Sequence, residues 1–310
     1  MKTIAAAEAP SKAIITGEHF VVHGSTALAA ALSRRVRATV SPAADLVVTS
    51  DRVPLRNREA LLPVRRVVAA MASELAFSPR IRVDISSNIP RGAGMGSSAS
   101  TMVAVAAALA KFQGIELGRP DLVRFAMEGE REIHGNPSGI DVNVCAYGGV
   151  VLFRMGGSPR QVRLTSPVRL IIAYSGRRRS TRTMIDRVSD TKERHPGLFK
   201  AMADSIGELS LEAAERLSSG DLAGLGRLLT LNHAVLESVG ASNKRLDALV
   251  ETLLSLGCSG AKLTGAGGGG SVIGVAPEKK GKSIISELAA RGFEAFEEQL
   301  PVEGVRSWLE

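Results

Sequence analysis

A glycine-rich segment at residues 90–100, with the sequence PRGAGMGSSAS, has the composition of a phosphate-binding loop. Glycine at every second position lets a backbone turn tightly and approach a ligand without interference from Cβ atoms. The Ala-rich stretch that follows is typical of a buried helix, and the N–H groups and dipole at a helix N-terminus attract a polyphosphate. Taken alone, the segment is equally compatible with a flexible strand–helix connection and an ordinary serine cap. The residues expected to contact phosphate are Gly92, Ala93, Gly94, Met95, Gly96, Ser97 and Ser98.

A second run of small residues, GAGGGG at residues 265–270, formally matches the G-x-G-x-x-G pattern of dinucleotide-binding folds. That interpretation requires a helix after the loop, whereas the following SVIGVA is typical of a strand. We therefore reject a dinucleotide site. The loop still predicts close approach of the backbone to a ligand or to the phosphate loop, with Gly267 and Gly268 as candidate ligand contacts.

A third segment, APEKKGKS at residues 276–283, partly matches a P-loop. It lacks the first glycine of that motif, and Pro277 removes a backbone N–H that would otherwise bind phosphate. Solvated lysines near the start of a helix explain the segment without a ligand.

The overall composition argues against several classes of function. The net charge of +8 favours anionic partners in general, but the basic residues form short clusters that are typical of a solvated surface. Aromatic residues make up only 4%, too few for stacking on nucleic-acid bases. Cys145 and Cys258 are too far apart for a C-x-x-C metal site, and no long apolar run predicts a membrane span. We expect a cytoplasmic enzyme that binds neither nucleic acid nor membrane.

The first half of the chain mixes strands and helices irregularly. Short β-branched runs predict several strands before the phosphate loop, including FVVHG at residues 20–24. Apolar spacing predicts helices at residues 62–76, after Gly96 and at residues 120–133. The segment HGNPSGID at residues 134–141 is expected to be a loop that leads into a strand.

The second half contains a long helical region from about residue 182 to residue 256 and ends in a strand near residues 294–300. Strands and helices without regular βαβ alternation predict an α+β protein. Because the stretch from Gly156 to Pro159 is rich in turn residues, we place the boundary there, with domains at residues 1–160 and 161–310.

Three separated motifs together resemble the GHMP kinase superfamily. They are APSK with GEHFVVHG in residues 9–24, the phosphate loop at 90–100, and KLTGAGGGG at 262–270. Within the superfamily, residues 134–141 and the modest length are similar to archaeal mevalonate kinases. The resemblance implies an N-terminal mixed-sheet ATP-binding domain and a C-terminal ferredoxin-like α/β domain.

The resemblance also implies roles for individual residues in phosphoryl transfer from ATP. Asp141 would be the catalytic aspartate that accepts or orients the substrate hydroxyl, and Lys12 would pair with it. Glu130 and Ser98 would bind Mg²⁺ through hard oxygen donors. Without the resemblance, a turn-forming aspartate is the commoner interpretation of Asp141, and the choice between Glu130 and the two glutamates beside it stays open. The adenine pocket is placed only loosely, near residues 45–65.

On the substrate side, the resemblance implies contacts from Glu18, His19, Thr181 and Arg182. Arg182 could donate two hydrogen bonds to a substrate carboxylate. A structural role for His19 stays open, as does a solvated or nucleic-acid-facing cluster for the arginines near Arg182. A metal site through His19 and His23 would need a helix, whereas the pattern there predicts strand and turn.

The function that the resemblance implies is transfer of the ATP γ-phosphoryl group to the 5-hydroxyl of (R)-mevalonate in isoprenoid biosynthesis, by a homodimer. Alternatives with the same fold are a mevalonate 3-kinase, a phosphomevalonate kinase or a homoserine kinase. A non-catalytic relative that binds ATP or nucleic acid would not need Lys12, Ser98, Glu130 and Asp141 together.

Overall fold

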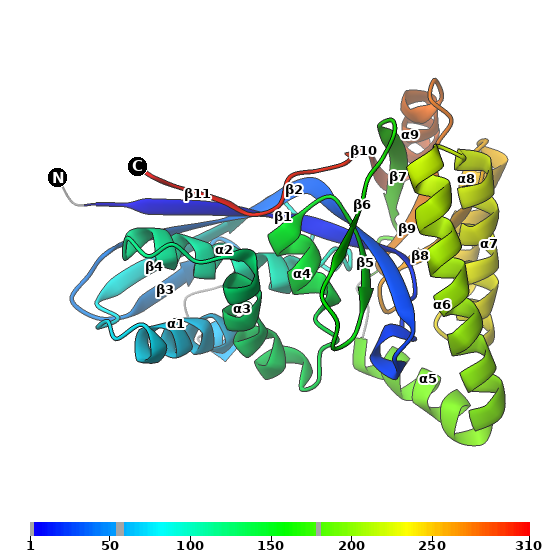
Figure 1. Ribbon diagram of the computed structural model, residues 1–310. Helices are drawn as coiled ribbons and strands as arrows, with labels where there is room; N and C mark the ends of the chain where they lie inside the picture. Colours follow the sequence, from blue (N-terminus) through cyan, green and yellow to red (C-terminus); the bar gives the residue numbers. More distant parts are fainter. Residues whose placement is uncertain (1–2, 54–58, 178–180) are drawn as a thin grey trace.

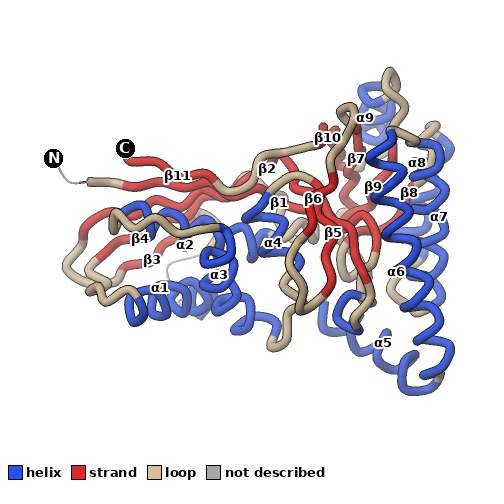
Figure 2. The backbone as a smooth tube through the Cα atoms, in the orientation of Figure 1, coloured by secondary structure: helices blue, strands red, loops and turns tan. Residues whose placement is uncertain are grey.

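The protein folds into two sheets that lie side by side, each covered by helices (Figure 1, Figure 2). The structure, a computed structural model, describes residues 3–53, 59–177 and 181–310, and of Thr181 and Arg182 it describes the backbone alone. The expected two-domain α+β architecture is confirmed.

The first sheet is mixed and has the strand order β11-β1-β2-β4-β3, with β5 attached to β2 and β6 attached to β5. Strand β2 serves two regions, because its first residues pair with β5 and its last residues pair with β4. Only the pairing of β3 with β4 is parallel among the described pairs of this sheet. The strands are β1 (Ala5–Thr16), β2 (Thr26–Pro42), β3 (Val47–Ser50), β4 (Ile81–Ser87), β5 (Val150–Arg154), β6 (Arg160–Val162) and β11 (Arg306–Leu309).

Helices cover one face of the first sheet (Figure 1). They are α1 (Leu62–Glu74), α2 (Ser97–Phe112), α3 (Arg119–His134) and α4 (Ile140–Tyr147), with a 3₁₀ turn η2 (Glu59–Leu61) before α1. Most of α2 is buried, which explains why its sequence is apolar nearly all round rather than on one stripe. Gly96, in a left-handed conformation, is the N-cap of α2 and no side chain caps the helix, so the alternative of an ordinary serine cap does not hold.

The second sheet is antiparallel with the order β10-β7-β9-β8. Its strands are β7 (Val168–Tyr174), β8 (Ala261–Thr264), β9 (Ser271–Val275) and β10 (Glu294–Leu300). Its helices are α5 (Thr181–Arg194), α6 (Pro196–Ser219), α7 (Leu222–Ser238), α8 (Lys244–Ser255) and α9 (Gly281–Ala290). The succession of strand, helices, two strands, helix and strand is the ferredoxin-like arrangement, elaborated by extra helices.

Several local predictions differ from the structure. Residues 20–24 form a turn with the 3₁₀ helix η1 (Val21–His23) instead of a strand. Asp141 was expected in a loop but lies in the first turn of α4, a short helix that the sequence did not reveal. The turn at Gly156 lies in the hairpin that joins β5 to β6.

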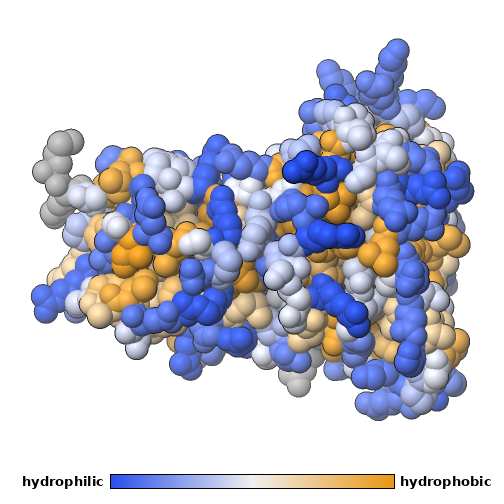
Figure 3. Space-filling view, in the orientation of Figure 1, coloured by the Kyte–Doolittle hydropathy of each residue, from blue (hydrophilic) through white to orange (hydrophobic). Residues whose placement is uncertain are grey.

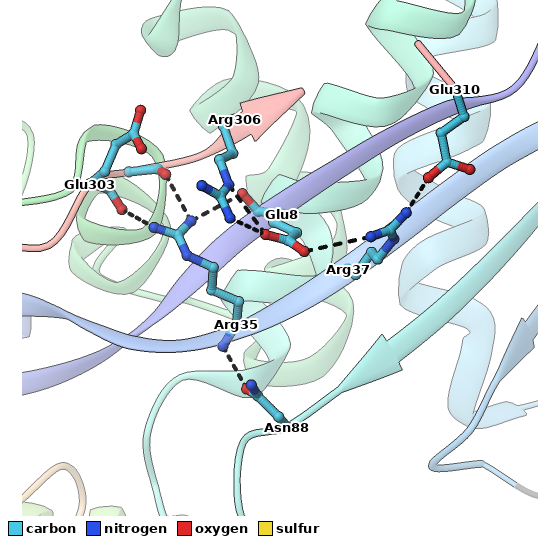
Figure 4. Close-up of polar contacts among 8 residues, drawn as sticks. Glu8, Arg35, Arg37, Asn88, Glu303, Arg306 and Glu310 are labelled. Atoms are coloured by element: carbon cyan, nitrogen blue, oxygen red, sulfur yellow. Dashed lines mark hydrogen bonds and ion pairs between the residues drawn. The ribbon is translucent and has the colours of Figure 1, made fainter. Parts of the chain in front are cut away.

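The last strand of the chain is β11, not the predicted one near residues 294–300, and it pairs with β1 at the edge of the first sheet. Figure 4 shows the charged side chains that accompany this pairing. Glu8 accepts from Arg306 at 2.7 Å and lies 3.8 Å from Arg37, which also pairs with Glu310. Because these charges are partly exposed, the backbone pairing is the stronger link. The division after residue 160 stays a prediction.

One hydrophobic cluster connects the two sheets and includes Leu28 of β2 together with Ile172 of β7. Figure 3 shows hydrophilic side chains interspersed with hydrophobic ones across one face of the molecule. Among the helices that the structure describes, none is long and apolar enough to cross a membrane.

Candidate active site

Lys12 and Asp141 form an ion pair between the first sheet and a helix. Lys12 lies in β1 and its side chain is only 2% exposed, whereas Asp141 is 28% exposed. Lys12 Nζ lies 2.8 Å from Asp141 Oδ1. Gly139, in a left-handed conformation, is the N-cap that starts α4 and so sets the direction of Asp141. The expected pairing is present, and it places a reachable carboxylate beside a cation that solvent cannot reach.

The phosphate loop passes directly over Lys12. Its glycines Gly92, Gly94 and Gly96 have φ values of 75°, 77° and 71°, a region that favours glycine. A Cβ atom at Gly96 would lie 2.7 Å from Lys12 Cγ. The Lys12 N–H donates to the Met95 carbonyl at 3.0 Å. The glycine spacing therefore brings the start of α2 against the Lys12–Asp141 pair.

The residues between these glycines anchor the loop. The side chains of Ala93 and Met95 are buried in the hydrophobic core. The Ala93 carbonyl accepts a hydrogen bond of 2.9 Å from Ser271 Oγ of β9, so the second sheet also holds the loop. Since both side chains point into the core, a phosphate would meet the loop through backbone N–H groups and the hydroxyls of Ser97 and Ser98.

Glu130, on the inner face of α3, is 3% exposed and lies close enough to Ser98 for that hydroxyl to lower its pKa. Its Oε1 has no hydrogen-bond partner among the described residues, and its Oε2 lies 3.8 Å from His134 Nε2. Burial and the nearby Asp141 raise the pKa of Glu130 to about 7, against the opposing effects of Ser98 and Lys12. The positive charge near Glu130 therefore does not compensate the ionised carboxylate, and a bound divalent cation would do so.

The structure distinguishes Glu130 from its neighbours on α3. Glu128 pairs with Arg131 on the same helix, and Glu132 accepts from Arg66 at 3.1 Å. Both pairs lie at the surface, so neither glutamate faces the phosphate loop. No cluster of three or more histidine, cysteine or acidic side chains in the described residues could hold a metal alone. Mg²⁺ does not need one, because it is commonly bound by one or two carboxylates together with water and substrate phosphates.

Glu18 and His19 lie in the turn between β1 and β2. Glu18 is 1% exposed and pairs with Lys262 of β8, a residue that the sequence did not single out. His19 has a φ of 62°, which is rare for a residue with a side chain, and its Nε2 lies 3.0 Å from the Ala266 carbonyl. Both residues line the same cavity as Lys12, as expected for a substrate-side position.

The C-terminal glycine loop serves packing as well as any ligand. A Cβ atom at Gly267 would lie 1.9 Å from the Ala241 carbonyl, and one at Gly268 would lie 2.6 Å from Met184 Sδ. A side chain at either position would therefore clash with neighbouring protein atoms. Gly265 and Ala266 of the same loop line the cavity instead. A ligand role for Gly267 and Gly268 stays a prediction.

A cavity of about 570 Å³ connects the polar residues described above. Its polar lining includes Lys12, Glu18, His19, Glu130, His134 and Asp141. Its apolar lining includes Val21, Val22, Met127, Ile140, Ile185 and Val188. No sequence signal marks these apolar residues, because they have the same types as core residues.

A second cavity of about 420 Å³ lies against the phosphate loop, and its lining includes Gly92 and Ser97. Arg52 and Arg91 also line it, and Arg91 Nη2 donates to the Arg52 carbonyl at 2.7 Å. Arg52 belongs to the loosely predicted adenine region, 45–65, and is the one residue among those described there that lines this cavity. The second cavity therefore adjoins the phosphate loop itself, whereas the first contains the Lys12–Asp141 pair.

Thr181 and Arg182 begin α5, but their side chains lie outside what the structure describes. The helix itself reaches the first cavity through Ile185, Val188 and Ser189. The predicted contact of Arg182 with a substrate carboxylate stays a prediction.

Family models match both halves of the chain. The N-terminal domain of GHMP kinases matches residues 63–149, and the C-terminal domain of GHMP kinases matches residues 210–294. The first match contains the phosphate loop, Glu130 and Asp141.

Curated relatives match this chain over nearly its full length. The mevalonate kinase of Aeropyrum pernix is 36% identical over 99% of both chains, and that of Archaeoglobus fulgidus is 35% identical over 92% of this chain and 98% of its own. Among solved structures, L. major mevalonate kinase in complex with R-mevalonate has a TM-score of 0.83 at 27% identity, covering 98% of this chain and 97% of that one. The Methanococcus jannaschii mevalonate kinase, at 24% identity and a TM-score of 0.83 over 96% and 98% of the two chains, shares the fold. This chain is an ATP-dependent small-molecule kinase that belongs to the GHMP kinases, in their mevalonate kinase family.

Proposed function

We propose that this kinase transfers the γ-phosphoryl group of ATP to the 5-hydroxyl of (R)-mevalonate. The observation that carries the proposal is the Lys12–Asp141 pair, which lies between the phosphate loop and a cavity of the size of a small metabolite. The full-length relatedness to mevalonate kinases supports the choice of acceptor.

In the proposed reaction the acceptor hydroxyl lies beside Asp141, and the phosphate loop holds the polyphosphate on the other side of Lys12. The hydroxyl oxygen forms a bond to the γ-phosphorus, the bond from that phosphorus to the bridging oxygen of ADP breaks, and the hydroxyl proton passes to the Asp141 carboxylate. Lys12 stabilises negative charge on Asp141 and on the reacting oxygens. The N–H groups at the start of α2 do the same for the phosphates.

Mg²⁺ fits the residues present. The unpartnered Oε1 of Glu130 and the hydroxyl of Ser98 are hard oxygen donors beside the phosphate loop. When bound, Mg²⁺ would neutralise charge on the phosphates of ATP. We assign Glu130 and Ser98 to that ion, and Lys12 and Asp141 to the acceptor.

The acceptor cavity matches the chemistry of mevalonate. This molecule carries a carboxylate, a tertiary hydroxyl and a methyl group besides the reacting hydroxyl. Glu18 and His19 offer polar groups along one wall, while Val21, Ile140 and Val188 offer apolar contacts. Arg182 and Thr181, at the start of α5, are the proposed partners of the carboxylate.

The test is an ATP-consumption assay with mevalonate, 5-phosphomevalonate, homoserine and galactose, followed by NMR of the product. We expect turnover of mevalonate to the 5-phosphate. Formation of a 3-phosphate, or preferential turnover of 5-phosphomevalonate or homoserine, would assign the chain to one of the alternative activities. Absence of turnover with all four acceptors would contradict the proposal. We further propose a cytoplasmic homodimer, which light scattering of the purified protein would test.

A further inference from the structure

A fully buried ion pair lies behind one wall of the acceptor cavity. Lys262 of β8 is 0% exposed and pairs with Glu18, and its Nζ also donates to the Leu263 carbonyl at 2.6 Å. Glu18 lines the cavity, whereas Lys262 does not. The pair therefore consists of one residue that faces the acceptor and one that supports it from the second sheet.

The contact is part of a longer attachment between the two sheets. Thr264 Oγ1 accepts from the Ile14 N–H at 3.0 Å and lies 2.9 Å from the Ile14 carbonyl, to which it donates. Two residues further on, the Ala266 carbonyl lies 3.0 Å from His19 Nε2. Alternate residues of β8 and its extension thus contact β1 and the turn that carries Glu18 and His19.

We propose that Lys262 is a positioning residue for the acceptor: it holds the Glu18 carboxylate at the cavity wall, where Glu18 accepts a hydrogen bond from a hydroxyl of the acceptor. The proposal deepens the proposed function and rests on it, because it assigns part of the acceptor site. It adds no catalytic group, since Lys262 would act only through Glu18.

Two observations favour this role over simple structural support. First, a buried ion pair is a weak source of stability, because apolar residues of similar volume often stabilise a fold as well or better. Second, Glu18 Oε2 has no hydrogen-bond partner among the described residues, which leaves it an acceptor without a donor. Burial raises the pKa of Glu18, and Lys262 opposes that rise. Loss of Lys262 would therefore favour a protonated carboxyl group that no longer acts as an acceptor on both oxygens.

The test compares Lys262→Met, Glu18→Gln and the double variant Glu18→Gln/Lys262→Met by thermal unfolding and steady-state kinetics. Lys262→Met leaves a buried charge unpaired and is expected to lower the melting temperature strongly. The double variant removes both charges and should recover most of that loss. Its KM for the acceptor should nevertheless remain raised about tenfold or more, the scale of a hydrogen bond to a charged group, with the KM for ATP within about twofold.

Glu298→Gln is the matched control. Glu298 is also a buried carboxylate between the sheets, accepting from the Ser33 N–H at 2.8 Å and from Ser33 Oγ at 3.0 Å, but it does not line the cavity. This variant should lower the melting temperature without changing the KM for the acceptor. If the double variant regains both stability and the normal acceptor KM, the Lys262–Glu18 pair contributes to stability only, and the proposal is wrong. An equal rise in the KM for ATP would contradict the proposal as well.

Failure of the proposed function would look different. If the wild type phosphorylates another acceptor in the panel, the mevalonate assignment fails, and the same variants assayed with that acceptor still decide the role of Lys262. If the wild type phosphorylates mevalonate and the double variant retains the normal acceptor KM, the hydrogen bond from the acceptor to Glu18 and the positioning role of Lys262 fail together, while the mevalonate assignment stands.

Discussion

Lys12 Nζ and Asp141 Oδ1 lie 2.8 Å apart although one residue belongs to the first strand and the other to a helix that follows the phosphate loop. The Cβ-free surface of Gly96 lies against the Lys12 side chain, so the loop, the cation and the carboxylate form one unit. The predictions below test what this unit does and what holds it in place.

Asp141→Asn should reduce kcat by about 10²- to 10⁴-fold, the usual contribution of a positioned general base. The KM for ATP should stay within about twofold, because the phosphate loop is unchanged. Steady-state kinetics with mevalonate measure both values. Asp121→Asn, at an exposed aspartate on α3 near Arg124, is the control and should retain full activity. A kcat for Asp141→Asn above a tenth of the wild-type value would contradict the catalytic role.

Gly96→Ala should impair catalysis through Lys12. The new Cβ would lie 2.7 Å from Lys12 Cγ and 2.8 Å from Lys12 Cε, so the lysine must move away from Asp141. Gly114→Ala is a matched control, because Gly114 has a similar φ of 69° but no atom within 4 Å of the added Cβ.

Both substitutions should lower the free energy of unfolding by about 1–2 kcal/mol through the left-handed backbone alone. Only Gly96→Ala should lower kcat/KM, by at least about tenfold, since a small displacement of a catalytic group has large effects. Equal activities of the two variants, measured together with urea unfolding, would show that the loop does not need to pass so close to Lys12.

Glu130 should make the ligand-free enzyme less stable as the pH rises. The pKa of this carboxyl is about 7 in the folded protein, against 4.5 for an unperturbed glutamate, so the folded protein binds the proton more tightly than the unfolded chain. The contribution of Glu130 to stability is therefore greatest below pH 4.5 and declines as the pH rises to about 7. The loss should be of the order of 3 kcal/mol.

Melting temperatures of the wild type and Glu130→Gln between pH 5 and 8 measure this effect, and the decline should be smaller in the variant. Adding Mg²⁺ and ATP should stabilise the wild type most at high pH, because a bound cation favours the ionised carboxylate. If the melting temperatures of the wild type and Glu130→Gln change with pH in the same way, the assignment of Glu130 as a buried carboxylate that binds a cation is wrong.

Thr264→Val should weaken the contact between the two sheets. Valine has a similar shape but leaves the buried N–H and carbonyl of Ile14 without their partner. We expect a loss of about 2–3 kcal/mol in the free energy of unfolding, the scale of unsatisfied buried polar groups. Thr252→Val, which removes an exposed hydrogen bond to the Ala248 carbonyl, should cost less than about 0.5 kcal/mol. Denaturant unfolding of both variants compares the two losses.

The sequence predicted the parts of the site that depend on local chemistry. Three alternating glycines permit a left-handed backbone, and Gly92, Gly94 and Gly96 all adopt it. An apolar stretch after the last of them predicts a buried helix, and α2 is one. Resemblance supplied the pairing of Lys12 with Asp141, which no local pattern would reveal, because the two residues belong to different elements.

Only the tertiary structure decided which of similar residues occupy the site. Glu128, Glu130 and Glu132 alternate along one helix, and burial alone separates Glu130 from the other two. The helix that carries Asp141 and the Lys262 partner of Glu18 were likewise absent from the sequence prediction. Backbone conformation at a glycine is a local property and can be inferred from the sequence, whereas exposure, charge environment and the distance between remote side chains arise only when the two sheets pack together.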